Sequence, residues 1–560
     1  MAVDILVKGG LIVDGTGGKR YQGNVAIKGG TIVGLGHVND SAPRVIDADG
    51  LVVAPGFWDV HTHYDAQLLW DPLATSSSWH GVTTILMGNC GFTLAPCRPG
   101  DQEWLLQTLA RVEEMNADVL RRTLPWPWED FGGYLDKLDE ALGVNAIPQV
   151  GHTAVRRYVM GPEASEREAT DEETARMRQV IAESLKAGAC GFTSSRAPTH
   201  WDGDGKPIPS RVASLDEYYA LVEELSAIDV GWVQAAMPEF KRHDFAEVSR
   251  RSQRPVCWND VVQQPERPDA WKGQLERMLA MREEGHRFIA LGHCQTHDRE
   301  FKFEHTGVFD RWPTWRRVLF EEHDRKRALL RDPATRETLR DEIAGKRNPS
   351  LAHVWNRVML VRSASGKYRQ FEKQMLADVA ARMEKDPLDA ALDIALDEGL
   401  ETHFRMLDPL GQDPEAAMRI LKTPHVVPGL SDGGAHMVTE LNTGFPTRLL
   451  GHWVRDAQAL SLEEAVHLLS GKAVAELNVP GRGLLQEGYA ADLTLFDPAT
   501  VASGERVFVD DLPGGGERLV QHAVGIEGTI VNGVMTLEHG KPTGHLGGKT
   551  LRSAALSKAT

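Results

Sequence analysis

GVTTILMG at residues 81–88 is the first of six short apolar runs that decide the fold class of this chain. The others are NAIPQVGH (145–152), GACGFTSS (188–195), GWVQAAM (231–237), RPVCWND (254–260) and RFIALGHC (287–294). Longer stretches with helical spacing separate them, and such alternation favours a parallel α/β architecture. About eight such units fit between residues 56 and 475, so a (β/α)8 TIM barrel is the first choice and a doubly wound open sheet the second.

One of the intervening helices has a recognisable start. The segment EATDEETARMRQVIAESLKAGA (168–189) has apolar positions at helical spacing. Thr170 stands three residues before Glu173, which is the pattern of a capping box. We therefore predict a helix that begins just after Thr170.

The two ends of the chain have a different sequence pattern from the middle. ILVKGGLIVDG (5–15) and NVAIKGGTIVGLG (24–36) are Val/Ile runs broken by glycine turns, and GIEGTIVNGVMTLEHGKPTG (525–544) repeats this pattern at the far end. Such runs are typical of hairpins. They predict one small sheet domain assembled from residues 1–55 and 476–560, with two independent β caps as the alternative.

Two segments interrupt the alternation within residues 56–475. Residues 101–140 hold helical stretches around LPWPWEDF, and residues 298–410 are long, charged and helical. In a barrel they would be insertions after strands, which often cover the mouth of the active site. Ordinary surface helices are an equally weighted alternative.

The composition excludes several classes of protein. The 560 residues include 62 Lys and Arg against 79 Asp and Glu, a net charge of −17, which disfavours binding to nucleic acid or anionic membranes. No run approaches the ~20 apolar residues of a membrane span, and MAVDILVKGG is not a signal peptide. Five scattered cysteines do not form a disulfide scaffold, so we expect a cytoplasmic protein.

The strongest chemical signal is PGFWDVHTHYD at residues 55–65. His61 and His63 are two positions apart, so on a strand both would point to the same side and could bind one metal ion. A chance pair is the alternative. Asp432 in GLSDGGAH (429–436) and Cys90 in GNCG (88–91) also follow apolar runs, although turn aspartates and inert buried cysteines are common.

These motifs together resemble the amidohydrolase superfamily, and within it the N-acyl-D-amino-acid deacylases. The resemblance rests on PGFWDVHTHYD, GVTTILMGNCGFTLAP, VGHTAVRRYVMG, GACGFTSSR, GLSDGGAH and GLLQEGYAADLTLFD, which span nearly the whole chain. It implies a (β/α)8 barrel with a small β-sandwich built from both termini. It also implies that His61, His63, Cys90 and Asp432 bind a divalent metal, with zinc as the first candidate. Asp432 would act as the general base for a metal-activated water.

The chain departs from the deacylase pattern on the fifth and sixth strands. That family carries metal-binding histidines there, whereas Gln234, Glu239, Cys257 and Asn259 occupy the corresponding neighbourhoods of this chain. We therefore expect one metal ion, although two remain an alternative.

A second departure concerns the substrate. The deacylases have an arginine shortly after the eighth-strand aspartate, where this chain has Asn442 and Thr443. An arginine is the usual bidentate partner of a carboxylate. Candidates for contacting the substrate or supporting the ligands are His152, Arg156, Arg196, His293, His297, His436 and Arg448. A purely structural role is the alternative for each histidine.

The motifs predict a metal-dependent hydrolase of a small molecule that cleaves a non-peptide C–N bond, most simply the amide of an N-acyl amino acid or N-acyl amine. Hydrolysis of a cyclic amide, lactone or ester, or a metal-assisted lyase reaction, would use the same site. A barrel that has lost its chemistry and serves as a scaffold is the third hypothesis. The resemblance also leaves room for a homo-oligomer.

Overall fold

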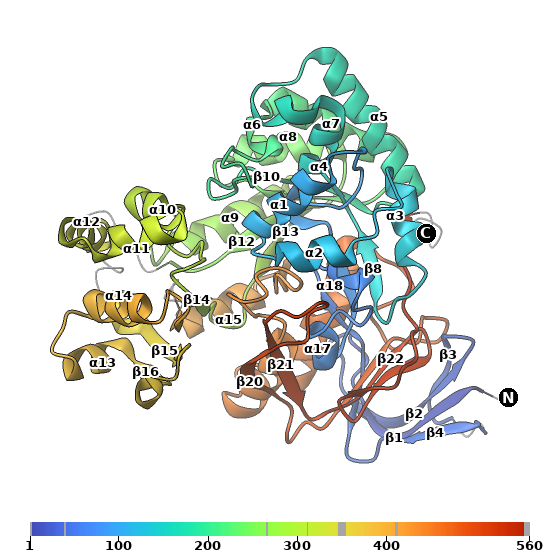
Figure 1. Cartoon of the computed structure of the whole chain (residues 1–560). Helices are drawn as coiled ribbons and strands as arrows, with labels where there is room; N and C mark the ends of the chain where they lie inside the picture. Colours follow the sequence, from blue (N-terminus) through green and yellow to red (C-terminus); the bar gives the residue numbers. More distant parts are fainter. Residues whose placement is uncertain are drawn as a thin grey trace.

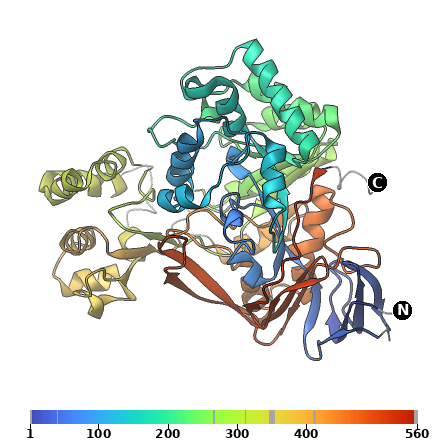
Figure 2. The same cartoon turned by 45° about the vertical axis from the view of Figure 1, so that its right-hand side comes forward.

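The computed structural model describes residues 3–38, 41–264, 267–310, 312–344, 354–408 and 413–553. A central part of mixed strands and helices carries a sheet with the N-terminus at one end and a separate group of helices and strands on the opposite side (Figure 1, Figure 2).

Parallel strands form the centre of the fold. One sheet contains β6 (Phe57–Asp59), β7 (Val82–Met87) and β8 (Asn145–Pro148). The other contains β9 (Val150–Gly151), β10 (Gly191–Ser195), β11 (Trp232–Ala236), β12 (Val256–Val261), β13 (Phe288–Gly292) and β18 (Val426–Pro428). Every pairing within these two sheets is parallel. The six runs found in the sequence thus become strands.

The two parallel sheets approach each other at both edges. Only Gln149 separates β8 from β9. At the other edges a parallel bridge joins Thr62, beyond β6, to Gly433, beyond β18. The N–H of His63 donates to the carbonyl of Gly433 at 2.7 Å. The segments that follow the first and last parallel strands therefore lie side by side.

Helices connect the parallel strands in sequence. They are α5 (Asp171–Ala187), α7 (Leu215–Ile228), α8 (Arg242–Ser252), α9 (Ala270–Glu283) and α15 (Pro414–Lys422). The predicted capping box is confirmed, because the Thr170 hydroxyl accepts from the N–H of Glu173 and the Glu173 carboxylate accepts from that of Thr170. Apolar side chains such as Ile181, Leu221 and Val248 bury these helices against the strands.

A separate apolar cluster collects side chains from nearly every parallel strand. Its members include Trp58, Leu86, Ile147, Trp232, Cys257, Ile289 and Val427. All are at least 96% buried. Such layers of inward-facing side chains make the centre of a barrel a packed core. Cys257, on β12, belongs to this apolar cluster, so its side chain is part of the packing.

The two termini share one sheet. Its order is β24-β23-β22-β19-β5-β1-β2-β3, with β4 paired to β1. The N-terminal members are β1 (Ile5–Ile12), β2 (Tyr21–Lys28), β3 (Thr31–Gly36), β4 (Arg44–Asp47) and β5 (Val52–Pro55). The C-terminal members are β19 (Leu493–Phe496), β22 (Ile526–Val531), β23 (Val534–Glu538) and β24 (Lys541–Pro542). The antiparallel pairing of β5 with β19 joins the two halves.

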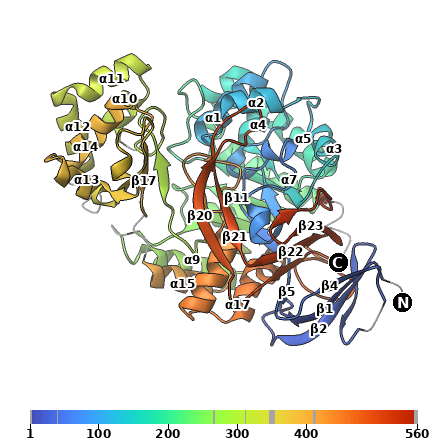
Figure 3. The ribbon, with the colours of Figure 1, turned by 60° about the horizontal axis from the view of Figure 1, so that its bottom comes forward.

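Parts of the C-terminal region also pack on the α/β part. The hairpin of β20 (Ala502–Val509) and β21 (Arg518–Val524) runs along it (Figure 3), and the His522 ring stacks on Trp79 with centroids 4.3 Å apart. Further on, the N–H of Leu551 donates to the carbonyl of Ala146 in β8. Within the described residues, no helix combines the length and apolar character needed to cross a membrane.

Two further segments lie between parallel strands along the chain, and the first contains α1 (Gln102–Val112), α2 (Ala117–Thr123) and α3 (Phe131–Leu138). The second contains α10 (Pro313–Leu319), α11 (His323–Arg331), α12 (Pro333–Ala344), α13 (Leu376–Arg382) and α14 (Pro387–Asp397). It also holds a sheet that the sequence did not predict, formed by β14 (Arg299–Phe301), β17 (His403–Met406), β15 (Val358–Arg362) and β16 (Gln374–Met375). Trp315 and Trp355 lie in its own apolar core with Phe301 and Phe404.

Candidate metal centre

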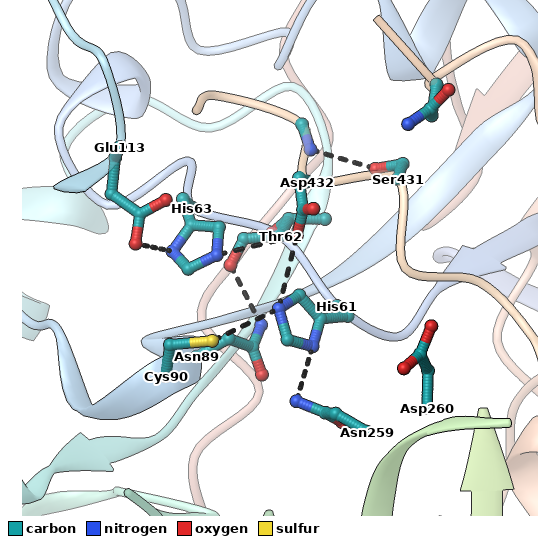
Figure 4. Close-up of polar contacts among 12 residues, drawn as sticks. His61, Thr62, His63, Asn89, Cys90, Glu113, Asn259, Asp260, Ser431 and Asp432 are labelled. Carbon is teal, nitrogen blue, oxygen red and sulfur yellow. Dashed lines mark hydrogen bonds and ion pairs between the residues drawn. The ribbon is translucent and has the colours of Figure 1, made fainter. Parts of the chain in front are cut away.

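His61 and His63 lie just beyond β6, at the carboxyl end of the parallel strands. They are 2% and 3% exposed. With Cys90 they form a group whose ligand atoms all lie within 4.8 Å of one another (Figure 4). The sequence pattern therefore brings together three side chains of the types that bind transition metals.

Asp432 reaches the same point from the segment after β18. Its Oδ1 lies 3.2 Å from Nε2 of His61 and 3.6 Å from Nε2 of His63. Burial alone would raise the pKa of Asp432, but hydrogen bonds from the two imidazoles outweigh it and hold the pKa well below its usual value. The carboxylate is therefore ionised at neutral pH.

Cys90 follows β7 in a short 3-10 helix, Asn89–Gly91, and has the left-handed φ of 54°. Its Sγ lies 3.7 Å from Nε2 of His61. Burial would raise the pKa of this thiol, but the charge on His61 outweighs it and lowers the pKa. In contrast, burial raises the pKa of Cys190 and Cys257, so Cys90 differs from these two in its readiness to become a thiolate.

The charges at this point favour a cation. Burial lowers the pKa of His61, but Cys90 and Asp432 outweigh it and raise that pKa to about 9. Groups that retain a proton so strongly lie in a negative potential. Two imidazole nitrogens, one thiolate and one carboxylate form a donor set that fits zinc or a similar divalent ion.

The other nitrogen of His61 faces two amides. Nε2 of Gln234, on β11, lies 3.0 Å from Nδ1 of His61, and Nδ2 of Asn259, on β12, lies 3.2 Å from it. These are the strands on which the deacylase pattern would place histidines. Glu239 lies apart from the centre, paired with Arg196.

Two consecutive glutamates follow α1, and the first of them reaches the centre. Oε1 of Glu113 lies 3.4 Å from Nδ1 of His63 (Figure 4). Glu114 accepts a hydrogen bond from Nδ1 of His436 at 2.9 Å. Neither glutamate was predicted, because no motif or periodicity in residues 101–140 distinguishes them from other charged helix residues.

A cavity of about 390 Å³ opens beside these residues. It is lined by His63, Cys90, Arg111, Val112, Glu113, Glu114, Thr199, His200, His297, Arg299, Gly307, Val308, Asp310, Trp312, Met406, Asp432 and His436. The lining comes from the α/β part, from α1 and from the segment after β13. Its volume suits a small molecule.

Two arginines line this cavity, and both were missed in the sequence. Arg111 is paired with Asp310 and lies 4.0 Å above the ring of Phe320. Arg299 lies on β14, with its Nη2 2.5 Å from Oε2 of Glu440. Both belong to segments for which insertions over the active-site mouth and ordinary surface helices were equal alternatives, and neither arginine stands in a motif.

Glu440 belongs to a buried chain of polar contacts. Its Oε1 lies 2.5 Å from Nδ1 of His297. Nε2 of His297 lies 2.6 Å from Nδ1 of His293, whose Nε2 is 2.7 Å from Oδ2 of Asp260. His297 lines the cavity, and His293 contacts the ring of His297. These two predicted candidates therefore lie close to the site.

His152 and Arg156, in contrast, lie in a structural cluster. His152 bonds Ser194 and Glu217 through its two ring nitrogens, and the guanidinium of Arg156 donates to Glu217 and to three backbone carbonyls. Both side chains are at most 1% exposed. Neither is among the described residues that line the cavity. Their positions in VGHTAVRRYVMG reflect packing of α4 (His152–Met160).

The remaining candidates are divided. His436 lines the cavity. Arg196 is tied to Glu239 and to the carbonyl of Ala213. Arg448 ends α16 (Phe445–Arg448) with an exposed side chain. Among the residues that the structure describes, neither arginine lines the cavity.

The fold and the site define a class of protein, and comparison with known sequences agrees with it. Residues 44–537 match the amidohydrolase family, and the chain belongs to that family. It is therefore an enzyme of the amidohydrolase type, as its motifs predicted, and the scaffold hypothesis is set aside.

Particular relatives narrow the resemblance to the predicted branch. The N-acyl-D-aspartate deacylase of Alcaligenes xylosoxydans xylosoxydans is 31% identical, over 89% of this chain and 86% of that protein. The D-aminoacylase of the same organism is 29% identical, over 99% of this chain and 98% of its own. A crystal structure of D-aminoacylase superimposes with a TM-score of 0.66 and 25% identity, over 98% of this chain and all of that one. D-aminoacylase is described with a binuclear metal centre, in which one metal activates and the second attenuates.

Proposed function

We propose that this amidohydrolase removes the acyl group from N-acyl-D-amino acids, using one divalent metal ion held by His61, His63, Cys90 and Asp432. The observation that carries the proposal is the convergence of these four donors at the wall of a cavity sized for a small molecule. Zinc is the first choice for two imidazoles, a thiolate and a carboxylate. The similarity to N-acyl-D-aspartate deacylase and D-aminoacylase supports the substrate class and its stereochemistry.

When bound, the metal ion would polarise the scissile carbonyl and lower the pKa of water at the site. Asp432 would take a proton from the attacking water and pass it to the departing amine. Its depressed pKa keeps it ionised, as a base must be before reaction. The same carboxylate thereby carries the proton from the nucleophile to the leaving group.

A single metal ion is proposed because of Gln234 and Asn259. Both present neutral amides towards His61, where imidazoles would be needed to hold a second ion. Amides are weak ligands for zinc compared with imidazole or thiolate. The relative's one-metal activation supports the view that one ion is enough for chemistry.

Arg299 is our candidate for binding the substrate's carboxylate, which favours an N-acyl amino acid over an N-acyl amine. Its guanidinium lines the cavity and is held by the buried Glu440. Arg111 is the other cavity arginine, but Phe320 covers its guanidinium and its side chain is less exposed, at 20% against 32% for Arg299. A guanidinium binds a carboxylate through paired charge-assisted hydrogen bonds.

We further propose that β6–β13 and β18 close into a (β/α)8 barrel spanning residues 56–475, with β8 and β9 as halves of one strand. The bridge between Thr62 and Gly433 supports this closure. Residues 101–140 and 298–410 would be its insertions. The shared terminal sheet supports a small β-sandwich domain of residues 1–55 and 476–560. All five cysteines are unpaired, which supports a reducing, cytoplasmic location.

The test is hydrolysis by zinc-loaded enzyme of N-acetyl-D-methionine, N-acetyl-D-aspartate and N-acetyl-D-glutamate beside their L-enantiomers. We expect release of at least one free D-amino acid and much slower release of the L forms. Cleavage of a cyclic amide or lactone, with no release from any N-acyl-D-amino acid, would contradict the proposal.

A further inference from the structure

The C-terminal end of α1 presents two consecutive carboxylates to the cavity, from a segment inserted into the α/β part. Glu113 is the helix C-cap, and its N–H bonds the carbonyl of Leu109 at 2.9 Å. The side chain of Glu113 is 4% exposed and that of Glu114 is 16% exposed. Both glutamates line the cavity and approach the His436 ring, but only Glu113 contacts a proposed metal ligand.

Glu113 contacts a proposed metal ligand. Its Oε1 lies 3.4 Å from Nδ1 of His63, while Nε2 of the same ring lies 3.6 Å from Oδ1 of Asp432 (Figure 4). The imidazole thus lies between a carboxylate on its outer nitrogen and the metal-binding cluster on its inner nitrogen.

Glu114 instead connects three parts of the fold. It accepts hydrogen bonds from Nδ1 of His436 at 2.9 Å and from the N–H of Gly307 at 3.1 Å, and also bonds the hydroxyl of Thr439. These partners belong to the loop after β18 and to the second inserted segment. Within the described part of the chain, the Glu114 carboxylate therefore bonds to groups other than the proposed metal ligands.

The backbone at Glu113 is anchored independently of its side chain. Its carbonyl accepts the N–H of His436 at 2.5 Å. Exchange of the carboxylate for an amide should therefore leave the end of α1 in place. This makes the two glutamates a matched pair that differ mainly in what their side chains bind.

We propose that Glu113 is a positioning residue of the metal centre, whose carboxylate pairs with Nδ1 of His63 and so presents Nε2 of that ring to the metal ion. The inference rests on the proposed function, since it presumes the metal site. A histidine that binds metal through one nitrogen is oriented, and made more basic, by a carboxylate on the other. The equivalent nitrogen of His61 faces neutral amides, so His63 would be the ligand held by a charge.

The test measures zinc affinity of metal-free protein by competition with a chromophoric chelator, without substrate. We expect E113Q to bind zinc about 10- to 100-fold more weakly than the wild type. E113D keeps the charge on a shorter side chain, so its zinc affinity should lie between those of E113Q and the wild type. E114Q removes the same charge from the neighbouring residue and should stay within a few-fold of the wild type.

Zinc affinity of E113Q equal to that of the wild type would overturn the inference. An equal loss of zinc affinity in E114Q would also overturn the inference, because the loss would then come from the net charge of the cavity and not from the contact with His63. Thermal unfolding of each variant checks the fold, and if E113Q does not fold, E113D binding as tightly as the wild type would count against the inference. Hydrolysis of N-acyl-D-amino acids by the wild type is a separate measurement, so failure of the proposed function is distinguishable.

Discussion

Oδ1 of Asp432 lies 3.2 Å from Nε2 of His61, although the two residues follow the last and the first of the parallel strands. The carboxyl ends of parallel strands gather at one face of a sheet or barrel, which is where such folds place their chemistry. The short contact follows from the pairing that joins Thr62 to Gly433. The catalytic proposal therefore depends on the fold as well as on the residues.

Loss of a histidine ligand should remove the metal ion without unfolding the chain. We expect H63A to lose zinc and to fall in activity by about 100-fold or more, since even removal of a residue that only supports a ligand costs 10- to 100-fold. Elemental analysis and circular dichroism check both points. H539A changes an exposed histidine and should retain both metal and activity. A fully metallated, fully active H63A would contradict the assignment.

Substitution of the proposed base, Asp432, should lower kcat far more than it weakens substrate binding. In D432N the amide can no longer accept the proton of water, so we expect kcat to fall by about 10²- to 10⁴-fold with little change in KM. Steady-state kinetics with the metal content measured on the same samples separates loss of base from loss of metal. Turnover within a few-fold of the wild type at full metal loading would show that another group is the base.

Arg299 should determine whether the enzyme prefers N-acyl amino acids over N-acyl amines. In R299M we expect kcat/KM for an N-acetyl-D-amino acid to fall about 10- to 100-fold, because a charge-assisted hydrogen bond is lost. The corresponding N-acyl amine, which has no carboxylate, should be unaffected. R448M changes an exposed arginine that was one of the sequence candidates, and it should behave as the wild type. The opposite pattern, with loss in R448M only, would assign the role to Arg448.

Glu440 should make stability depend on pH in the acid range. Burial raises the pKa of Glu440, but Arg299 and His297 outweigh it and lower the pKa from 4.5 to about 2. Since the pKa is lower in the folded state, the stabilising contribution is full above pH 4.5 and is lost as pH falls towards 2. Urea unfolding of wild type and E440Q should therefore differ most near pH 7 and converge below pH 4.5. A constant difference over this range would refute the pairing.

Much of the site could be predicted because its chemistry lies in local motifs. His61 and His63 are two positions apart just beyond β6, and Cys90 and Asp432 each follow an apolar strand. The resemblance to the deacylases implied that these four residues meet, and the carboxyl ends of parallel strands are where such folds gather their chemistry. The capping box at Thr170 is likewise local. Such features need only neighbours in sequence.

The site residues that could not be predicted depend on contacts between segments that are distant in the sequence. Glu113 reaches His63 from the end of α1, and Arg299 reaches the cavity from a strand in a sheet whose presence the sequence did not indicate. Neither stands in a motif or a periodic pattern. Arg156 was a candidate for the substrate's carboxylate because the usual arginine is missing, and the structure places it in a buried contact with Glu217.

The most direct test is the metal content of protein purified without chelators. We predict about one equivalent of zinc or a similar divalent ion per chain, because the described donors form one set of four around His61. That equivalent should be absent from H63A. No metal after purification, with none taken up on adding zinc, manganese or iron, would contradict the central claim, and two tightly held equivalents would contradict the single-metal centre.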